Sequence, residues 1–340
     1  MPQADKILVI RFSAMGDVAM TVPILKEFKR HYPNTELLVV SRSAFKPFFD
    51  GLANSSFYTF DPKLKHKGFF GLIKLFNALR KQKVTAVADL HNNLRSKIIC
   101  FLFLLFGIKS ISVNKGRKEK KCLTRKDNKV LAPLKLTIQR YAEVFQKLGY
   151  PFCINNQLSI QKKPTRLQKW IGVSPFAQHL QKVYPLHKME EVVMGLANLG
   201  YQVFVFGGST EEQTIAEKWD SNHANISSLV RKMGLDEELQ FISKLDVMLS
   251  MDSSGMHLAS LMDIPVVSVW GATHPYAGFL GYGQSISDAV QLELHCRPCS
   301  VYGNVPCYRG DFACMNNLSE QAVINQVLKK LKDEQTTVFN

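Results

Sequence analysis

Short apolar runs alternate with segments of helical period from the start of the chain. The apolar runs at 6–12 and 36–40 have the character of buried parallel strands. Between them, the segment 18–32 places Val22 and Leu25 on one face of a helix. This order predicts a βαβ unit that opens an α/β domain.

A polar turn at 13–17 follows the first predicted strand. Gly16 is the only glycine in this turn, where a dinucleotide fingerprint needs three, so we do not expect NAD. Asp17 lies at or just before the start of the next helix. It is either a carboxylate that caps this helix, or a catalytic carboxylate at the crevice where α/β sheets bind ligands. The local sequence fits both interpretations.

A second polar cluster, at 89–96, ends the apolar run at 84–90. Because the carboxyl ends of parallel strands meet at one edge of a sheet, we expect this cluster to lie near a ligand site. The helix predicted at 97–106 is apolar nearly all round, which is typical of a buried helix or of one that rests on a membrane. We favour burial.

The second half of the chain repeats the α/β pattern, with further apolar runs that end in glycine or small polar residues. A polar segment with little pattern, at 155–166, separates the halves. We therefore predict an N-terminal Rossmann-like domain at 1–158, a linker at 159–168 and a C-terminal Rossmann-like domain at 169–340. The last helix is a candidate to pack back on the N-terminal domain.

The stretch 249–261 reads as strand, turn and helix. Its turn, 252–255, has the sequence Asp-Ser-Ser-Gly, whose residue types cap a helix and leave backbone N–H groups for a phosphate. An ordinary αβ turn with a good cap is the alternative, and His257 alone is no more than a common core histidine. After another predicted strand, Gly207 and Gly208 permit close backbone approach to a ligand.

The chain is strongly basic, with 43 Lys and Arg against 28 Asp and Glu and a net charge of +15. This excess indicates a polyanionic partner: nucleic acid, an anionic membrane surface or a phosphorylated substrate. The run at 115–129 carries much of the surplus. We see no nucleic-acid-binding motif, no signal peptide and no apolar run near the roughly 20 residues that span a bilayer. We expect a cytoplasmic protein that is peripheral at the inner face of the cytoplasmic membrane, which it contacts through a basic and apolar patch, and that does not bind nucleic acid.

Four cysteines near the C-terminus have spacing that is compatible with zinc: Cys296, Cys299, Cys307 and Cys314. His295 is a further candidate ligand. Persistent disulfides are not expected in a cytoplasmic chain. Structural zinc and reduced thiols both remain open, and we expect no metal in catalysis and no cofactor.

The motifs together resemble glycosyltransferase family 9, the lipopolysaccharide heptosyltransferases. The matching stretches are RFSAMGDV at 11–18, DLHNNLRS at 89–96, KVYP at 182–185 and DSSGMHLA at 252–259. They occur in the family's order over nearly the whole chain. The family commonly has Thr-Gly where this chain has Ser253-Ser254, a change that keeps the hydroxyl and the turn.

The resemblance implies a GT-B fold, in which two Rossmann-like domains with parallel sheets face each other across a cleft. It implies inverting, metal-independent transfer of a sugar, usually heptose from ADP-heptose, onto a lipopolysaccharide or lipooligosaccharide core acceptor. Asp17 would deprotonate the acceptor hydroxyl, and Lys182 would stabilise the leaving diphosphate. The donor would be bound by Asp252, Ser253, Ser254, Gly255, His257, Glu212, Gly207 and Gly208, and the acceptor by Ser13, Asn92, Asn93 and Arg95.

Two other classes of function remain as alternatives. A nucleotide-sugar epimerase or phosphohydrolase would use the same diphosphate site without a sugar acceptor. A binding protein for anionic surfaces would depend on the basic run and not on Asp17.

Overall fold

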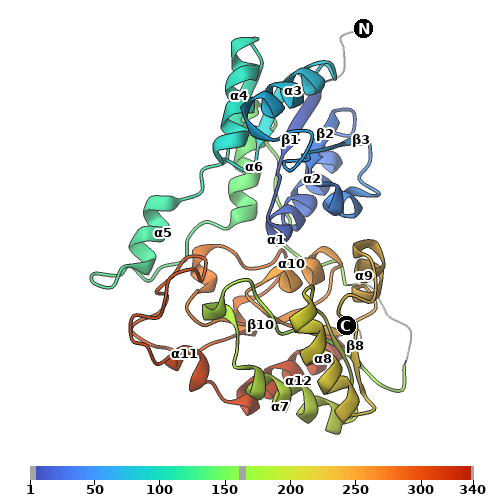
Figure 1. The fold of residues 1–340 in the computed structure, drawn as a ribbon, viewed down its shortest axis with the longest axis vertical. Helices are drawn as coiled ribbons and strands as arrows, with labels where there is room; N and C mark the ends of the chain where they lie inside the picture. Colours follow the sequence, from blue (N-terminus) through green and yellow to red (C-terminus); the bar gives the residue numbers. More distant parts are fainter. Residues whose placement is uncertain (1–4, 161–165, 338–340) are drawn as a thin grey trace. The chain divides into compact units, whose positions relative to one another are not determined.

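The computed structural model describes residues 5–160 and 166–337, which form two compact α/β units (Figure 1). The first unit consists of the described residues up to Gly116 together with Lys135–Asn155. The second consists of Arg117–Leu134 and the described chain from Asn156 onward. The middle of the predicted linker, 161–165, lies outside the described residues.

The first unit is built on a five-stranded parallel sheet. Ile7 of its central strand lies opposite Leu37 on one side and Ala86 on the other. Ile7 and Leu8, which point to opposite faces, are both fully buried, as expected for a sheet covered on both sides. In spatial order the strands are β3 (Ser55–Thr59), β2 (Glu36–Ser41), β1 (Lys6–Ile10), β4 (Ala86–Asp89) and β5 (Lys109–Ser112).

Helices cover both faces of this sheet. Leu8 and Ile10 share a buried cluster with side chains of α3 and α4. In another layer α2 packs against α6, where the Phe28 and Phe145 rings lie 4.8 Å apart. The helices are α1 (Met15–Ala19), α2 (Thr21–His31), η1 (Ser43–Phe49), α3 (Gly68–Arg80), α4 (Leu94–Leu105) and α6 (Thr137–Leu148).

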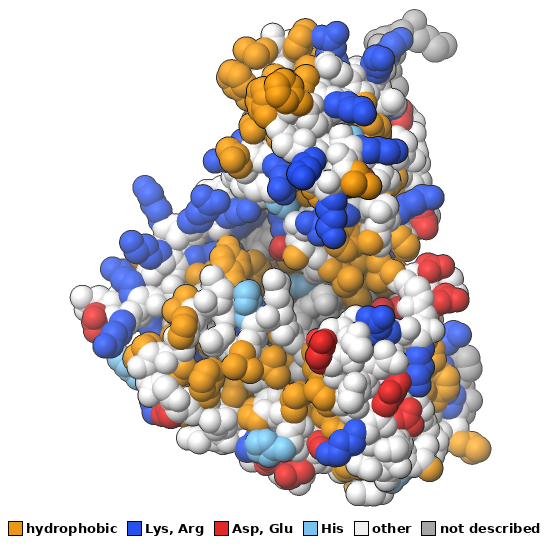
Figure 2. Space-filling model, in the orientation of Figure 1, with side chains coloured by type: hydrophobic (Ala, Val, Ile, Leu, Met, Phe, Trp, Pro, Cys, Tyr) orange, Lys and Arg blue, Asp and Glu red, His pale blue; other side chains and the backbone are white. Residues whose placement is uncertain are grey.

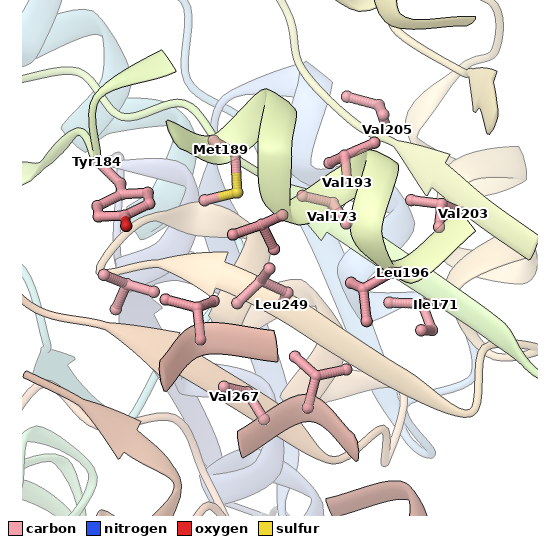
Figure 3. Close-up of a cluster of buried hydrophobic side chains, with 14 of the residues drawn as sticks. Ile171, Val173, Tyr184, Met189, Val193, Leu196, Val203, Val205, Leu249 and Val267 are labelled. Atoms are coloured by element: carbon pink, nitrogen blue, oxygen red, sulfur yellow. The ribbon is translucent and has the colours of Figure 1, made fainter. Parts of the chain in front are cut away.

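The second unit contains a six-stranded parallel sheet, with a core that α7 covers on one face (Figure 3). Val173 and Leu249, on neighbouring strands, are fully buried under Met189 and Val193 of α7. In spatial order the strands are β11 (Ala289–Val290), β10 (Val266–Val269), β9 (Val247–Met251), β6 (Trp170–Ser174), β7 (Gln202–Val205) and β8 (Ile226–Ser228).

Helices alternate with these strands along the chain, as in a doubly wound fold. They are η2 (Leu180–Lys182), α7 (Leu186–Asn198), α8 (Thr210–Asn222), α9 (Leu235–Ile242), α10 (Ser254–Leu261), η3 (Pro275–Ala277), η4 (Ile286–Asp288), α11 (Ala313–Asn316) and α12 (Glu320–Thr337).

The basic segment Arg117–Leu134, which we predicted as part of the N-terminal domain, belongs to the second unit. It contains a helix, α5 (Arg117–Thr124). The Lys129 ammonium donates to the carbonyl oxygens of Cys296 at 2.8 Å and Pro298 at 3.0 Å. The Lys120 ammonium lies 3.9 Å from the ring centre of Phe279. These long-range contacts explain why the continuous domain 1–158 is wrong at this point.

The last helix, α12, packs within the second unit, and its packing on the N-terminal domain stays a prediction. Val323 and Val327 are fully buried in the core that α7 also covers. Two ion pairs hold the helix in place: Lys330 with Asp288 at 2.9 Å and Lys188 with Glu320 at 3.0 Å. Apolar contact with the sheet therefore decides where this helix lies.

The helix predicted as buried, α4, is buried on one face only and begins at Leu94. Ile99 and Phe103 are almost fully buried against the sheet, whereas the side chains of Phe101 and Leu105 are 58% and 65% exposed. Among the described residues, no helix is long and apolar enough to cross a membrane.

Candidate active site

In the first unit, the predicted site residues gather where the winding of the sheet reverses. From β1 the chain proceeds to β2 and β3 on one side, and from β4 to β5 on the other. Ligands of open α/β sheets bind outside the carboxyl ends of the strands at such a switch point. Asp17 follows β1, and the cluster 89–96 follows β4, so both lie there.

Arg11 joins the two strand ends and holds the Asp17 carboxylate. Its Nη1 donates to the carbonyl oxygen of Leu90 at 2.7 Å, and its Nη2 forms an ion pair with Asp17 Oδ2. The Arg11 side chain is almost buried, whereas that of Asp17 is 33% exposed and can be reached by a substrate. Burial alone lowers the pKa of Arg11, but Tyr141 and Asp17 raise it above its ordinary value, so the guanidinium stays charged.

His91 is not the base of this site. It is buried, and its Nδ1 accepts the Phe12 N–H at 3.2 Å. Burial, together with the positive charges of Arg11 and Lys115, lowers the pKa of His91 to about 3. The imidazole is therefore neutral at physiological pH, its Nδ1 is occupied by the Phe12 N–H, and its side chain is buried away from a substrate. Asp17 remains the candidate base.

Asp89 folds the loop that carries the predicted acceptor residues. Its carboxylate is fully buried and accepts four hydrogen bonds. Oδ1 receives the N–H groups of His91 at 2.9 Å and Asn92 at 2.8 Å. Oδ2 receives the hydroxyls of Ser96 and Ser112, each at 2.9 Å. Asp89 is thus an anchor of the site rather than a group that meets a substrate.

We predict that Asp89→Asn lowers the free energy of unfolding by about 3 kcal/mol. The amide has only one oxygen, so two of the four donors lose the charged oxygen that accepts their hydrogen bonds. Urea unfolding followed by circular dichroism measures the change. Asp50→Asn, at an exposed carboxylate of the same unit, is the matched control and should stay within about 0.5 kcal/mol of the parent. Equal midpoints for the two variants would contradict the anchoring role.

The predicted acceptor residues differ in what they do in the fold. Asn93 Oδ1 accepts the Ser96 N–H at 2.9 Å and so caps α4. The Asn92 amide donates to Val113 at 2.6 Å, while its buried Oδ1 has no hydrogen-bond partner among the described residues. Arg95 is exposed and Ser13 is half-buried. All four lie at the switch point of the first unit, and their roles toward an acceptor remain predictions.

In the second unit the winding reverses between β6 and β9. An ion pair joins the segments that follow these two strands: Lys182 Nζ lies 2.8 Å from Asp252 Oδ2. The side chains are 17% and 5% exposed. A nearly buried cation is therefore fixed at the position where an α/β sheet binds its ligand.

The N-terminus of α10 lies beside this pair. Ser253 is the cap residue, but its side chain makes no capping hydrogen bond within the described structure, so the hydroxyl does not occupy the N–H groups of the first turn. A Cβ on Gly255 would clash with the Ser174 hydroxyl at the end of β6, so only glycine fits there. Ser254 opens the helix, and His257 is buried on it. The predicted diphosphate residues thus come together.

Gly207, Gly208 and Glu212 lie after β7, the strand next to β6. Glu212 Oε2 accepts the N–H groups of Gly208 at 2.6 Å and Ser209 at 3.0 Å, and the Ser209 hydroxyl accepts the Glu212 N–H at 3.1 Å. This capping box stabilises the start of α8. Glu212 therefore has a structural role that we did not predict. Its contact with the donor remains a prediction.

Gly303 is a site residue that the sequence did not reveal. Its φ is +77°, and a Cβ there would clash with Cγ of Lys182. Its N–H is held by the Ser300 hydroxyl at 2.9 Å. The glycine therefore lets the loop close over the stem of Lys182. The signal in the sequence was only a glycine in a long C-terminal loop.

The four clustered cysteines line one small pocket, next to Gln181 and Ala272. All four are free thiols. Burial raises the pKa of Cys314 to about 11 and also raises the pKa of Cys299. Among the described residues no group of three or more His, Cys, Asp or Glu has the arrangement of a metal site. Zinc content stays a prediction, which metal analysis of the purified protein can test.

Comparisons with known proteins agree with this geometry. A family model described as glycosyltransferase family 9 (heptosyltransferase) matches residues 72–306. Lipooligosaccharide heptosyltransferase 2 of Campylobacter jejuni is 22% identical to this chain and is similar over 93% of it and 96% of its own length.

Two solved structures are similar over nearly the whole chain. The family 9 glycosyltransferase of Veillonella parvula has a TM-score of 0.73 at 17% identity, and the match covers 98% of this chain and 99% of that one. Escherichia coli heptosyltransferase WaaC with ADP-2-deoxy-2-fluoro heptose has a TM-score of 0.67 at 18% identity, with 95% and 99% covered. These likenesses show the GT-B fold. Because the family model matches most of the chain, the protein is a glycosyltransferase that belongs to family 9, the heptosyltransferase family.

Proposed function

We propose that the protein transfers heptose from ADP-heptose onto the core of lipopolysaccharide or lipooligosaccharide, with inversion at the anomeric carbon and without a catalytic metal ion. The named relative is a lipooligosaccharide heptosyltransferase, and the similar WaaC structure holds an ADP-heptose analogue. The observation that carries the proposal is the fixed Lys182 cation beside the N-terminus of α10.

In the proposed reaction the Asp17 carboxylate accepts the proton of the acceptor hydroxyl. The hydroxyl oxygen forms a bond to the anomeric carbon of the donor, on the face opposite the diphosphate. The bond between that carbon and the diphosphate oxygen breaks, and ADP leaves with the electron pair. One displacement of this kind inverts the configuration.

The second unit stabilises the charge that develops on ADP. A helix N-terminus presents several N–H donors and the positive end of the helix dipole to a phosphate. Lys182 adds a full positive charge, which Asp252 holds in place. These fixed groups provide the charge compensation that a metal ion provides in other enzymes. This argument supports a mechanism in which chelation of metals leaves the rate unchanged.

We expect Gly303→Ala to lower kcat/KM for transfer by about 10- to 100-fold, because the new methyl group displaces Lys182 and misplacement by about 1 Å costs this much. Gly310→Ala is the matched control, since Gly310 has the same φ of +77° and a Cβ on it would have no other atom within 4 Å. Steady-state kinetics of ADP release measure both variants. Equal losses would mean that backbone strain, and not Lys182, causes the effect.

A panel of nucleotide sugars, assayed with and without a lipid-linked core acceptor and with EDTA, tests the proposed function. We expect ADP release only with ADP-heptose and acceptor together, and the same rate in EDTA. Nucleotide release without acceptor would favour a phosphohydrolase. Isomerisation of the donor sugar would favour an epimerase, and either result would overturn the proposal.

A further inference from the structure

One face of α4 exposes large apolar side chains to solvent. Phe101, Leu104 and Leu105 are 58%, 52% and 65% exposed, and Phe106, just beyond the helix, is 54% exposed. Figure 2 shows hydrophobic side chains gathered over the end of the first unit where α3 and α4 lie in Figure 1. We call these four residues the α4 patch. The buried core cluster of the unit contains none of them, although the rings of Phe106 and the core residue Phe76 lie 5.5 Å apart between their centres.

The α4 patch is not a by-product of core packing. Ile99 and Phe103 on the opposite face already bury the helix against the sheet, with Phe103 in contact with Phe76 of α3 at 4.9 Å between ring centres. A surface helix of a soluble protein normally places polar residues on the outer face. Clustered exposed apolar residues mark an interaction surface.

The exposed charged residues at 62–110, the part of the sequence that contains the patch, are all basic, and the half-buried Asp61 comes just before it. From 62 to 110 the only acidic residue is Asp89, which is fully buried. Arg80 lies 4.4 Å from the ring centre of Phe106. Lys109 lies opposite Ala86 where the strands β4 and β5 begin to pair. Lys83 precedes Ala86 by three residues and so comes just before the same end of β4. The exposed cations of this segment are Lys63, Lys65, Lys67, Lys74, Arg80, Lys81, Lys83, Arg95, Lys97 and Lys109.

We propose that the α4 patch and its flanking cations dock the first unit on an anionic lipid bilayer. Exposed Phe and Leu insert at the boundary between headgroups and acyl chains, while Lys and Arg remain among the anionic headgroups. A second protein copy is a less suitable occupant, because two such surfaces would bring like charges together. Insertion of a few side chains from one helix face makes the proposed contact interfacial and reversible.

This surface differs from the one that the sequence indicated. In the basic run 115–129, Lys120 and Lys129 are engaged by Phe279 and by backbone carbonyls of the second unit. The α4 patch instead lies on the unit that carries Asp17. The inference deepens the proposed function, because a lipid-linked acceptor lies at such a bilayer. Vesicle binding itself involves no sugar, so the two proposals can fail separately.

Co-sedimentation with vesicles tests the proposal. The full chain should bind vesicles that contain phosphatidylglycerol and bind those of phosphatidylcholine much less. The double variant Phe101→Asn/Leu105→Asn should raise the lipid concentration for half-binding at least about tenfold, because two buried apolar groups are lost. The double variant Leu199→Asn/Ile286→Asn, at residues of the second unit that are 56% and 46% exposed, is the matched control and should bind like the parent.

A charge variant provides an independent measurement. Lys81→Gln/Lys83→Gln should weaken binding about fivefold for each removed cation, and the loss should shrink in high salt. Lys218→Gln/Lys244→Gln, in the second unit, should have little effect. Circular dichroism and ADP binding confirm that each variant is folded.

Two results would overturn the inference. The first is unchanged vesicle binding by Phe101→Asn/Leu105→Asn. The second is that light scattering shows a dimer of the parent protein, that Phe101→Asn/Leu105→Asn is a monomer, and that this variant still binds vesicles. Transfer to a soluble, delipidated acceptor tests the proposed function alone. If the parent protein does not transfer heptose to this acceptor, the proposed function is contradicted and the vesicle-binding result is unaffected.

Discussion

Replacement of Asp17 by Asn is expected to abolish sugar transfer and to leave ADP-heptose binding within about twofold of the parent. General base catalysis contributes about 10²- to 10⁴-fold, and an amide cannot take the proton. Asn keeps a side-chain oxygen that can accept the N–H of Ala14, which Asp17 Oδ2 accepts at 3.4 Å. The substitution therefore removes the base and the charge that pairs with Arg11, and it keeps the local hydrogen bond.

The same variant decides between the two interpretations of Asp17. If the carboxylate only caps α1, Asp17→Asn should have a small effect on transfer, and Asp17→Ala should lower the free energy of unfolding by about 1 kcal/mol. Titration calorimetry with ADP-heptose and steady-state transfer assays separate binding from chemistry. Transfer by Asp17→Asn within tenfold of the parent would contradict the catalytic role.

The second large effect is expected at Lys182. Lys182→Met should lower kcat about 10²- to 10³-fold, since one preorganised group that stabilises developing charge contributes this much. It should also lower the free energy of unfolding by about 2 kcal/mol, because Asp252 is left nearly buried without its cation. Fast-mixing assays and urea unfolding measure the two effects.

The double variant Lys182→Met/Asp252→Asn separates catalysis from stability. With no unpaired charge in the site, it should recover most of the stability of the parent. Its turnover should stay as low as that of Lys182→Met. If turnover recovers together with stability, Lys182 is a structural residue and the proposed diphosphate site is wrong.

Local patterns in the sequence predicted the parts of the fold that depend on near neighbours. Apolar runs indicated the strands, and polar or glycine residues after them indicated the strand ends, including those with Asp17 and Asp252. Parallel strands have this signature because both faces are buried and ligands meet their carboxyl ends. The family resemblance then assigned the residues at these strand ends to one predicted reaction.

Contacts between distant residues could not be predicted in this way. The Lys182–Asp252 pair exists because β6 and β9 are neighbours, and the strand order is a property of the whole sheet. Arg11 likewise reaches Leu90 across the β1–β4 junction. Asp89 appeared to be one polar residue in a cluster, although its four hydrogen bonds make it an anchor of the loop.

The two larger errors have the same origin. The segment Arg117–Leu134 joins the second unit through two contacts, of Lys129 with Cys296 and of Lys120 with Phe279, whose partners are far apart in sequence. The helix α4 has apolar residues on every side, so periodicity could not indicate which face the sheet covers. Burial is decided by the partner surface, and the sequence of one helix does not contain that surface.

Mass spectrometry of a lipid-linked core acceptor, after incubation with the protein and ADP-heptose, tests the central claim most directly. Transfer by the proposed mechanism predicts an acceptor that is heavier by one heptosyl residue, one ADP released for each acceptor modified, and neither product with Asp17→Asn. The claim would be contradicted if the parent protein consumed ADP-heptose and the acceptor remained unmodified.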